Sequence, residues 1–301
     1  MPELPEVQTI VDDLNKKVKG LTITNVWTDW PKYFRRSKGG FEGFKKEVKN
    51  KKIEKVWRLG KNIIFDLSGD QEMLIHQKMT GHLLIGRWRI KNNKPVVLEK
   101  GLFSEKVNGY IHAMFWLSNS PSIKVGASEM MGFSDLRKFG KILTVSKKYF
   151  TNLEDVKNIG PDPLQAGFGF SQFRDLIKKK RGPIKKVLMD QNVVSGIGNI
   201  YADEILFVSK IHPLTKTESL DDKELKMIFE VAEKILKKAI KLRGTSTSDY
   251  RDTAGKKGGY GDVRLVYQRA GEKCPHGCGG AIKRIKIGGR SAHFCPSCQK
   301  I

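Results

Sequence analysis

The sequence predicts an α+β protein: an N-terminal β-rich domain, a sandwich or a barrel, that begins with a helix, and then a helical domain that ends in a zinc-binding hairpin. Three observations lead to this prediction. Short β-prone segments recur between residues 21 and 146, helical periodicity replaces them after about residue 150, and all four cysteines lie at or beyond Cys274. The chain has 301 residues, a length that favours about two domains with sizeable cores.

The first element is a helix near the N-terminus. Pro5 suits the first helical position, and apolar residues follow at helical spacing from Val7 to Val18 until Gly20 ends the pattern. Short β-prone segments come next, at a spacing typical of a sandwich or barrel: 21–27, 52–57, 62–67, 73–75, 112–117 and 141–145. Residues 87–110 have a mixed, basic composition that indicates an exposed connection.

Helices dominate the second half of the chain. We expect them at 171–180, 183–190, 199–208 and 221–242, the last with a continuous apolar stripe and Ser219 as its cap. A Gly-rich loop, 244–261, follows, and a loop of this length inside a compact domain is either disordered or functional. Residues 263–267 are typical of a strand. The expected domains are therefore 1–148, 149–262 and 263–301.

The chain is strongly basic. Lysine and arginine total 56 against 32 aspartate and glutamate residues, which gives a formal net charge of +24. This charge favours a polyanionic partner, with nucleic acid as the leading candidate, although a host proteome with a basic bias would give the same sign. No apolar segment approaches the roughly 18 residues of a membrane helix, and the acidic start, residues 1–6, does not resemble a secretory signal. We therefore expect no membrane partner.

The cysteines form two close pairs, Cys274 with Cys278 and Cys295 with Cys298, separated by a hairpin-length insert. Cysteines gathered in this way favour a metal site in a reducing compartment over a disulfide framework. Two such pairs match a structural four-thiolate zinc site. The sequence therefore predicts one zinc ion as the cofactor.

The insert between the two pairs is predicted to be a β-hairpin. Gly288 and Gly289 supply a tight turn, with Arg290 at or just past its tip. The first cysteine pair encloses three residues where two are usual, so His276 or His293 as a substitute ligand is a weaker alternative. A purely structural zinc clip would not explain an arginine displayed on this hairpin.

A proline follows the initiator methionine. A small second residue normally allows Met1 to be removed, which would leave Pro2 as a free secondary amine. An α-amino group titrates near ~8 and a lysine near ~10.4, so far more of the former is an unprotonated nucleophile at neutral pH. The positive end of a helix beginning at Pro5 favours this form further. Glu3 and Glu6 are carboxylates that can move protons beside such an amine.

Residues 195–201 read Ser-Gly-Ile-Gly-Asn-Ile-Tyr. Two glycines give a tight turn just before a helix, and Asn199 is a good cap. The free backbone amides at a helix start bind phosphate well. Such a turn on its own often does no more than join two helices.

Five motifs together resemble the formamidopyrimidine-DNA glycosylase family, whose sister branch is endonuclease VIII. They are the start Pro-Glu-Leu-Pro-Glu-Val at 2–7, His-Gln-Lys-Met-Thr-Gly at 76–81, Asp-Leu-Arg-Lys-Phe-Gly at 135–140, a helix-two-turn-helix at 185–204, and the C-terminal cysteine segment. They follow the family order along nearly the whole chain. The resemblance implies an N-terminal β-sandwich domain and a helical domain with a zinc finger.

The resemblance also implies catalytic roles. Pro2 corresponds to the nucleophile that attacks C1′ of the damaged nucleotide and forms a Schiff base, and Glu3 to the proton donor of the sugar ring oxygen. Lys61 and Arg290 correspond to the proton donors of the β- and δ-eliminations. Both side chains also suit phosphate clamping, because a lysine offers a point charge and an arginine a bidentate fork.

A target base must leave the duplex before an enzyme can reach it. Met79, Arg137 and Phe139 match the family residues that fill the resulting void, although ordinary core packing would also explain Met79 and Phe139. Other positions match DNA-contacting residues of the family: His76, His112, Lys138, Arg181, Lys185 and Asn199.

Loop 244–261 resembles the family loop that caps an extruded 8-oxoguanine, and we refer to it as the capping loop. Its expected contact residues are Thr245, Ser246, Asp249 and Tyr250, with Ser248 in the same motif. A mobile linker is the alternative. The implied enzyme is a bifunctional DNA glycosylase and AP lyase of base excision repair, acting on oxidised purines. An oxidised-pyrimidine glycosylase of the endonuclease VIII type and a non-catalytic zinc-finger DNA-binding protein are the other readings.

The sequence departs from the family pattern at several positions. Gln77 and Lys78 replace the usual Leu-Gly, Leu136 replaces a smaller residue, and residues 87–110 lengthen the first domain. These departures affect contact details and not the reaction. The expected partner is double-stranded DNA with oxidised bases or abasic sites, bound by a monomer in a bacterial-type cytoplasm.

Overall fold

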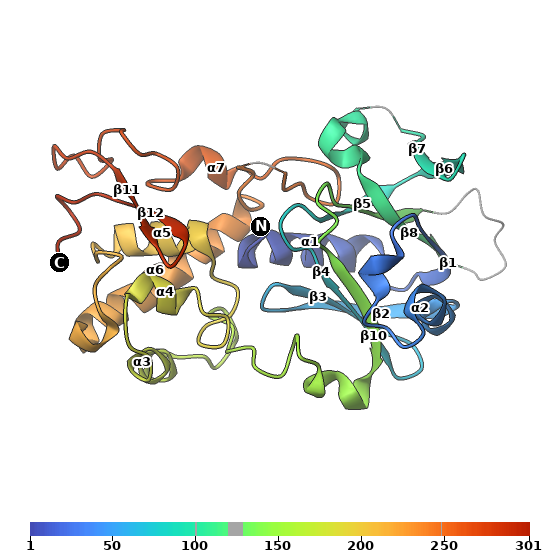
Figure 1. Cartoon of the computed structure of the whole chain (residues 1–301), viewed down its shortest axis with the longest axis horizontal. Helices are drawn as coiled ribbons and strands as arrows, with labels where there is room; N and C mark the ends of the chain where they lie inside the picture. The colour runs from blue at the N-terminus through green and yellow to red at the C-terminus, as the bar shows by residue number, and fades with distance from the viewer. Residues whose placement is uncertain (100, 120–128, 248) are drawn as a thin grey trace. The chain divides into compact units, whose positions relative to one another are not determined.

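The computed structural model describes residues 1–99, 101–119, 129–247 and 249–301 (Figure 1). The chain forms two compact units. Unit 1 contains residues 1–157 and 243–259, and unit 2 contains residues 158–242 and 260–301. Within the described ranges, no helix is both long and apolar enough to cross a membrane.

Unit 1 is built on an eight-stranded antiparallel sheet with the order β10-β4-β3-β2-β1-β8-β9-β5. The strands are β1 (Thr22–Thr28), β2 (Lys51–Leu59), β3 (Asn62–Leu67), β4 (Gln71–His76), β5 (His82–Gly86), β8 (Ile111–Ser118), β9 (Met130–Ser134) and β10 (Lys141–Ser146). All six strands predicted between residues 21 and 146 are present. Strands β5 and β9 were not predicted.

The sheet consists of two four-stranded halves that meet at a short β1–β2 junction. Only two residue pairs join these strands, Thr22 with Lys52 and Ile23 with Lys51. One core cluster takes buried side chains from both halves, such as Phe115 and Met131 from one and Phe65 and Ile75 from the other. This shared core gives the sandwich that the resemblance implied, one of the two arrangements that the spacing of the segments allowed.

Helix α1 (Leu4–Lys17) packs on β2 and β3. Its apolar stripe, which includes Val7, Ile10 and Leu14, enters the main core of unit 1, because residues three and four apart share a helix face. A second helix, α2 (Gly40–Val48), adds Phe44 and Val48 to the same core. The predicted N-terminal helix is therefore confirmed.

The predicted connection at 87–110 carries structure of its own. It contains the hairpin β6 (Trp88–Lys91) and β7 (Lys94–Val97), and two 3-10 turns at Leu102–Ser104 and Lys106–Gly109. The β6–β7 turn is Asn92-Asn93, and both residues adopt positive φ. That combination is the signature of a two-residue hairpin turn.

Unit 2 is helical and ends in a hairpin (Figure 1). Its helices are α3 (Phe170–Lys178), α4 (Ile184–Leu188), α5 (Asn199–Val208), α6 (Asp222–Lys241) and α7 (Tyr260–Val263), and its strands are β11 (Lys283–Ile287) and β12 (Arg290–Phe294). The four predicted helices and the hairpin are confirmed. The cap of α6 is Asp221 and not Ser219, because the Asp221 carboxylate accepts a hydrogen bond from the Glu224 backbone N–H at 2.7 Å.

The predicted strand at 263–267 is wrong. The backbone N–H groups of Leu265, Val266 and Tyr267 donate to the buried carboxylate of Glu204 at 2.8–2.9 Å. A backbone that wraps around a side chain satisfies its donors without a partner strand. The apolar, β-branched pattern of this segment therefore serves packing against the zinc module and not a sheet.

The segment Arg243–Gly259, which holds most of the capping loop, belongs to unit 1. Tyr250 enters the core of that unit, and the Arg243 guanidinium bonds both Asp13, on α1, and Asp252. The expected functional domains, 1–148, 149–262 and 263–301, are a different division from these two compact units and stay a prediction. Ser248 lies outside the described residues.

Candidate active site and nucleic-acid interface

The start of helix α1 brings Pro2 together with two carboxylates. Pro2, Glu3 and Glu6 are all buried. Glu3 is the cap of the helix, and the Glu6 carboxylate accepts a hydrogen bond from the Glu3 backbone N–H at 2.7 Å in a reciprocal capping box. The residue next to the candidate nucleophile is thus held by the helix itself.

The same Glu6 side chain reaches the capping loop. Its second carboxylate oxygen accepts a hydrogen bond from the Thr245 backbone N–H at 2.7 Å, and the Tyr250 hydroxyl donates to the Glu6 backbone carbonyl at 3.4 Å. Burial and the nearby Glu6 carboxylate raise the pKa of Tyr250 well above its ordinary value, so the phenol stays protonated and donates. The loop is therefore packed on the first turn of α1 and is not a free linker.

Lys61 lies in the two-residue turn between β2 and β3, close to helix α1. Arg58 supports this turn, since it donates to the Gly60 carbonyl at 3.1 Å and to the Gln8 side chain of α1 at 2.9 Å. The Lys61 side chain is buried, and its charge acts on His76 across the β3–β4 pair. The structure therefore places Lys61 in a turn that Arg58 ties to helix α1.

His76 ends strand β4 as a neutral imidazole. Burial, followed by the charges of Lys78, Lys61 and Lys141, lowers its pKa to about 3. Its Nδ1 accepts a hydrogen bond from the Lys78 backbone N–H at 2.9 Å, which leaves Nε2–H as the donor toward a ligand. A neutral ring with one oriented N–H suits a hydrogen bond to a phosphate oxygen.

The three void-filling candidates are exposed. Met79 is 42% and Phe139 is 54% exposed, so core packing does not explain either side chain. The Arg137 guanidinium lies over the Phe139 ring, 4.7 Å from its centroid. Exposed apolar side chains that gather on adjoining turns mark an interaction site, whereas single ones do not.

Asp135, which sequence reasoning left without a role, ties these side chains to one another. Its buried carboxylate accepts hydrogen bonds from the Thr80 hydroxyl at 2.5 Å and the Gly140 backbone N–H at 2.8 Å. The Thr80 hydroxyl in turn accepts from the Arg137 backbone N–H at 3.1 Å. The turn that carries Met79 and the loop that carries Phe139 are thereby joined through one carboxylate. The Asp in the motif at 135–140 was the available signal.

Lys138 lines a basic pocket of about 510 Å³ in unit 1, beside the exposed Phe139. The other cations of the pocket are Lys32, Arg35, Arg36, Lys78 and Lys141. Burial and the like charges of Lys141 and Arg36 lower the pKa of Lys78. Crowded cations of this kind favour an anion in the pocket.

His112 lies on β8, on the other half of the sheet. Its Nδ1 contacts the Asp29 carboxylate at 2.9 Å. The carboxylate fixes the orientation of the ring, so that Nε2 is the atom left for a ligand.

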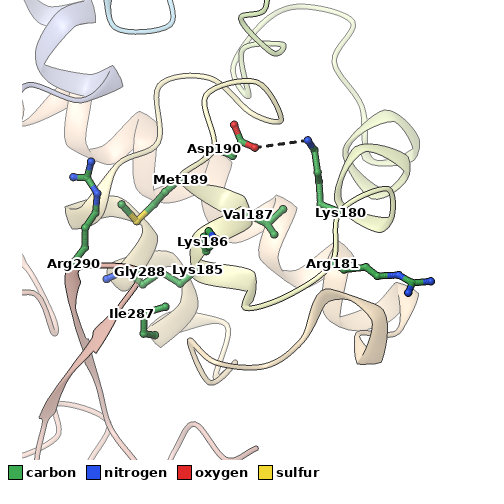
Figure 2. Close-up of a pocket in the computed structure, with 10 residues that line it drawn as sticks. All are labelled: Lys180, Arg181, Lys185, Lys186, Val187, Met189, Asp190, Ile287, Gly288 and Arg290. Carbon is green, nitrogen blue, oxygen red and sulfur yellow. Dashed lines mark ion pairs between the residues drawn. The ribbon is translucent and has the colours of Figure 1, made fainter.

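A second basic pocket, of about 350 Å³, lies in unit 2 between α4 and the β11–β12 hairpin (Figure 2). Arg290 is the first residue of β12, just past the Gly288–Gly289 turn as predicted. Figure 2 shows Arg290 on one side of the pocket and Arg181 on the other, with Lys180 paired to Asp190 at 3.8 Å. Two candidate phosphate contacts therefore frame one concave basic surface.

Lys185 differs from the other candidates because its side chain is only 1% exposed. Its ammonium group forms an ion pair with Asp203 at 2.7 Å and donates to the Ser291 carbonyl at 2.5 Å, while Asp203 accepts from the backbone N–H of His293 at 2.9 Å. The lysine thus fastens α4 and α5 to the hairpin. Its contact with DNA stays a prediction.

Asn199 is the first residue of α5, and the cap is Gly198, so the prediction of Asn199 as the cap is wrong. The Asn199 side-chain oxygen is buried without a hydrogen-bond partner. The turn before it is held instead by Gln191, whose amide donates to the Met189 and Ile197 carbonyls and accepts from the Gly196 N–H at 2.9 Å.

The four cysteine sulfurs lie within 4.8 Å of one another. The Sγ atoms of Cys274 and Cys298 are 3.7 Å apart, and those of Cys278 and Cys295 are 3.5 Å apart. Four thiolates around one tetrahedral zinc ion, with Zn–S bonds near 2.3 Å, have sulfurs about 3.8 Å apart. The sulfurs therefore fit a zinc ion despite the longer first pair.

The two histidines near the cysteines have other partners. His293 binds Asp203 through Nδ1 at 3.0 Å, and the His276 ring stacks on Phe207 at 4.3 Å. Among the described residues, the metal-binding group in this region consists of the four cysteines alone. Neither histidine replaces a thiolate.

Comparison with known proteins gives three family matches along the chain. The formamidopyrimidine-DNA glycosylase N-terminal domain matches residues 1–142, and the formamidopyrimidine-DNA glycosylase H2TH domain matches residues 159–251. The zinc finger found in FPG and IleRS matches residues 271–301.

Curated relatives match over the full length. The formamidopyrimidine-DNA glycosylases of Heliobacterium modesticaldum and Desulforamulus reducens are 34% and 35% identical to this chain, and each match covers 100% of this chain and at least 99% of the relative. Among solved structures, the Lactococcus lactis Fpg in complex with DNA containing an abasic site has a TM-score of 0.83 at 32% identity, over 99% of this chain and 100% of that one. MutM bound to DNA with carbocyclic 8-oxo-G has a TM-score of 0.82, over 100% of both chains.

Fold, site and matches together define a DNA glycosylase with AP lyase activity, an enzyme of base excision repair. The cysteine cluster of such an enzyme holds one structural zinc ion. Within this class, the chain belongs to the formamidopyrimidine-DNA glycosylase family.

Proposed function

We propose that this protein excises oxidised purines, chiefly 8-oxoguanine and formamidopyrimidines, from double-stranded DNA and then cuts the strand by β,δ-elimination. The observation that carries the proposal is the start of α1, where Pro2 lies beside the buried Glu3 and Glu6 carboxylates. Solved relatives bound to DNA with an abasic site, Fapy-dG or 8-oxo-G support it.

The first step needs the amine of Pro2, which is free only after Met1 is removed. The Pro2 nitrogen attacks C1′ of the damaged nucleotide, and the bond from C1′ to the base breaks with its electron pair leaving on the base. The departing base takes up the proton that the Pro2 nitrogen loses. Glu3 gives a proton to the sugar ring oxygen, the bond from C1′ to that oxygen breaks, and the nitrogen lone pair forms an iminium with C1′. Glu6 holds the Glu3 backbone in place during this step.

The iminium then acts as an electron sink. Loss of a C2′ proton expels the 3′ phosphate, and loss of a C4′ proton expels the 5′ phosphate, so the strand is cut on both sides. Lys61 serves the first elimination and Arg290 the second. For both, phosphate clamping is the physically secure part of the role, since an arginine hardly gives up its proton.

Extrusion of the base leaves a gap that Met79 and Phe139 fill in place of stacking, while Arg137 bonds the orphaned base. His76, His112, Lys138, Arg181, Lys185 and Asn199 bind the phosphate backbone, and the capping loop covers the extruded purine through Thr245, Ser246, Asp249 and Tyr250. The protein acts as a monomer, in the bacterial cytoplasm, with functional boundaries at 148/149 and 262/263.

The test is covalent trapping. Purified protein is incubated with a duplex holding one 8-oxoguanine opposite cytosine, borohydride is added to reduce the iminium, and the adduct is mapped by mass. We expect an adduct at Pro2, none with a protein that retains Met1, and a normal adduct with Pro5→Ala, a proline in the same segment that has no free amine. An adduct formed only with an oxidised pyrimidine would show that the substrate preference is that of the endonuclease VIII branch. The absence of an adduct with every substrate would reject the catalytic proposal.

A further inference from the structure

The base of the capping loop is buried, whereas its tip is not. Arg251, Asp252 and Thr253 are buried, while Ser246 and Asp249 are partly exposed. The loop therefore has a fixed part and a part that faces outward. What holds the fixed part determines where the tip can lie.

Much of this hold comes from residues 101–109, which we call the clamp segment. Asn108, in the second 3-10 turn of that segment, is buried, and its side-chain N–H group donates to the Leu102 carbonyl at 2.7 Å and to the Gly255 carbonyl at 3.4 Å. A Cβ added at Gly255 would lie 2.8 Å from the same Asn108 nitrogen. A side chain at 255 would therefore displace the Asn108 amide, and the φ of +78° at this position also favours glycine.

The Asn108 side chain is itself oriented from the sheet. Its Oδ1 contacts Nε2 of His82 at 3.0 Å, and His82 is the first residue of β5. Strand β5 also donates directly to the loop, from the Ile85 backbone N–H to the Thr253 carbonyl at 2.9 Å. One buried amide thus connects sheet, clamp segment and loop.

A second contact lies at the surface. The Arg251 guanidinium is buried at the loop base and reaches the half-exposed carboxylate of Glu105, in the clamp segment, at 3.4 Å. Arg251 also donates to the Tyr250 carbonyl at 2.9 Å. Glu105 therefore contacts the residue that follows the core anchor of the loop.

The clamp segment is well supported from behind. The Ser134 hydroxyl donates to the Val107 carbonyl at 3.0 Å, and the Asp135 backbone N–H donates to the Tyr110 carbonyl at 2.9 Å. Phe103 packs edge-on against Trp88 at 5.6 Å. Since Asp135 also organises the loop of Phe139, the same support reaches the candidate void-filling side chains.

We propose that the clamp segment positions the capping loop, and that Asn108 and Glu105 are positioning residues for base excision but not for cleavage at an abasic site. The inference rests on the proposed function, because it assumes that the loop tip covers an extruded base. An abasic site has no base to cover. Loosening the loop base therefore slows the step that needs the tip and leaves the elimination steps intact.

The test compares two substrates for each variant. We expect Asn108→Ala to lower kcat for 8-oxoguanine excision about tenfold, the loss that about 1.4 kcal/mol of positioning would give. Cleavage of a pre-formed abasic site should stay within about twofold of the wild-type rate. Glu105→Gln should show the same pattern more weakly, because an exposed ion pair contributes little.

Glu99→Gln is the matched control. Glu99 also forms a surface ion pair with an arginine of segment 87–110, at 3.0 Å to Arg87, and has no hydrogen bond or ion pair to the described residues of the loop. It should leave both reactions unchanged. An equal loss of both reactions in folded Asn108→Ala, or no loss in either clamp variant, would overturn the proposal. If Asn108→Ala fails to fold, Glu105→Gln against Glu99→Gln decides.

Hydrogen exchange separates this inference from the proposed function. The backbone N–H groups of Asp252 and Gly255 are bonded within the loop base, to the Lys256 and Asp252 carbonyls at 2.9 Å. Both should exchange faster in Asn108→Ala and Glu105→Gln, and at the wild-type rate in Glu99→Gln. Unchanged exchange refutes the clamp. Faster exchange in a protein whose wild type does not excise 8-oxoguanine refutes only the proposed substrate.

Discussion

The Glu6 carboxylate accepts a hydrogen bond from the Thr245 backbone N–H at 2.7 Å, which joins the first turn of α1 to a loop almost 240 residues later in the chain. Its other oxygen accepts from the Glu3 N–H at the same distance. One buried carboxylate therefore holds both the residue beside the candidate nucleophile and the loop proposed to cover the base. The segment of the candidate nucleophile and the capping loop are therefore coupled through a single side chain.

Glu6→Gln tests this coupling. An amide has one acceptor oxygen where the carboxylate has two, so one backbone N–H would face an NH2 group. We expect the free energy of unfolding to fall by about 1–3 kcal/mol, the usual cost of a buried donor left unpaired, and excision to fall by at least about tenfold. Asp12→Asn, on the exposed part of the same helix, is the control. Wild-type excision by Glu6→Gln would show that the bridge is dispensable.

Gly244→Ala should displace the capping loop. Gly244 has a φ of +81°, and an added Cβ would lie 2.8 Å from the Glu6 side chain. Gly20 has a similar φ of +89° with nothing within 4 Å of the added Cβ, so Gly20→Ala reports the backbone strain alone, about 1 kcal/mol. Gly244→Ala should lose more stability than that and should lose excision, while Gly20→Ala remains active. Urea unfolding and an 8-oxoguanine excision assay on both variants measure the difference.

Phe139 and Phe133 should behave in opposite ways. Phe139 is exposed, so Phe139→Ala should change stability by less than about 0.5 kcal/mol yet strongly reduce excision, because an unfilled gap lets the base return to the stack. Phe133 is fully buried, so Phe133→Ala should cost about 3–5 kcal/mol. The fluorescence of 2-aminopurine beside the lesion reports extrusion. A large loss of stability in Phe139→Ala would show instead that this side chain packs in the core.

The zinc ion should be required for DNA binding. Cys295→Ser removes one of four thiolates at a buried position of the hairpin module, and we expect loss of the metal and of affinity for lesion DNA. Ser297→Ala, which lies between Cys295 and Cys298 in the sequence, should keep both the metal and the affinity for DNA. Metal content by mass spectrometry and a binding titration with DNA provide the readouts. Full affinity in zinc-free Cys295→Ser would make the hairpin irrelevant to binding.

The sequence predicted elements with strong local patterns and missed those without them. The alternating strands and the long helices were found, but β5 and β9 were not, because every position in both is buried and Gly86 and Gly132 weaken the pattern. The Asn92–Asn93 turn was a usable hairpin signal that the basic composition of 87–110 concealed.

Candidate side chains were predictable, but their partners were not. The motifs named Lys185, yet its burial depends on an ion pair with Asp203, which lies on another helix. Residues 263–267 have the pattern of a strand but bond the Glu204 carboxylate instead of a partner strand. Asn108 carries no motif, and its role follows only from where Gly255 lies in the fold. Contacts distant in the chain are set by packing, which local pattern does not encode.

His82 should make stability depend on pH. It is fully buried, and burial lowers its pKa to about 4 from an ordinary 6.5. Between these two values the unfolded chain binds a proton that the folded protein does not, so the free energy of unfolding falls as pH falls from about 6.5 to 4, by up to about 1.4 kcal/mol per pH unit for this group.

Because His76 and the carboxylates also titrate in that range, the wild-type slope alone does not isolate His82. His82→Gln keeps a side chain that can donate to Asn108 but does not titrate, so its stability should fall less steeply between pH 6.5 and 4.5. Urea unfolding at several pH values gives the two slopes, and an NMR titration of the His82 ring gives the pKa directly. Identical slopes, or a ring that protonates near pH 6.5, would mean that the His82 side chain is exposed to solvent in the folded protein. The contact between β5 and the clamp segment would then not be formed.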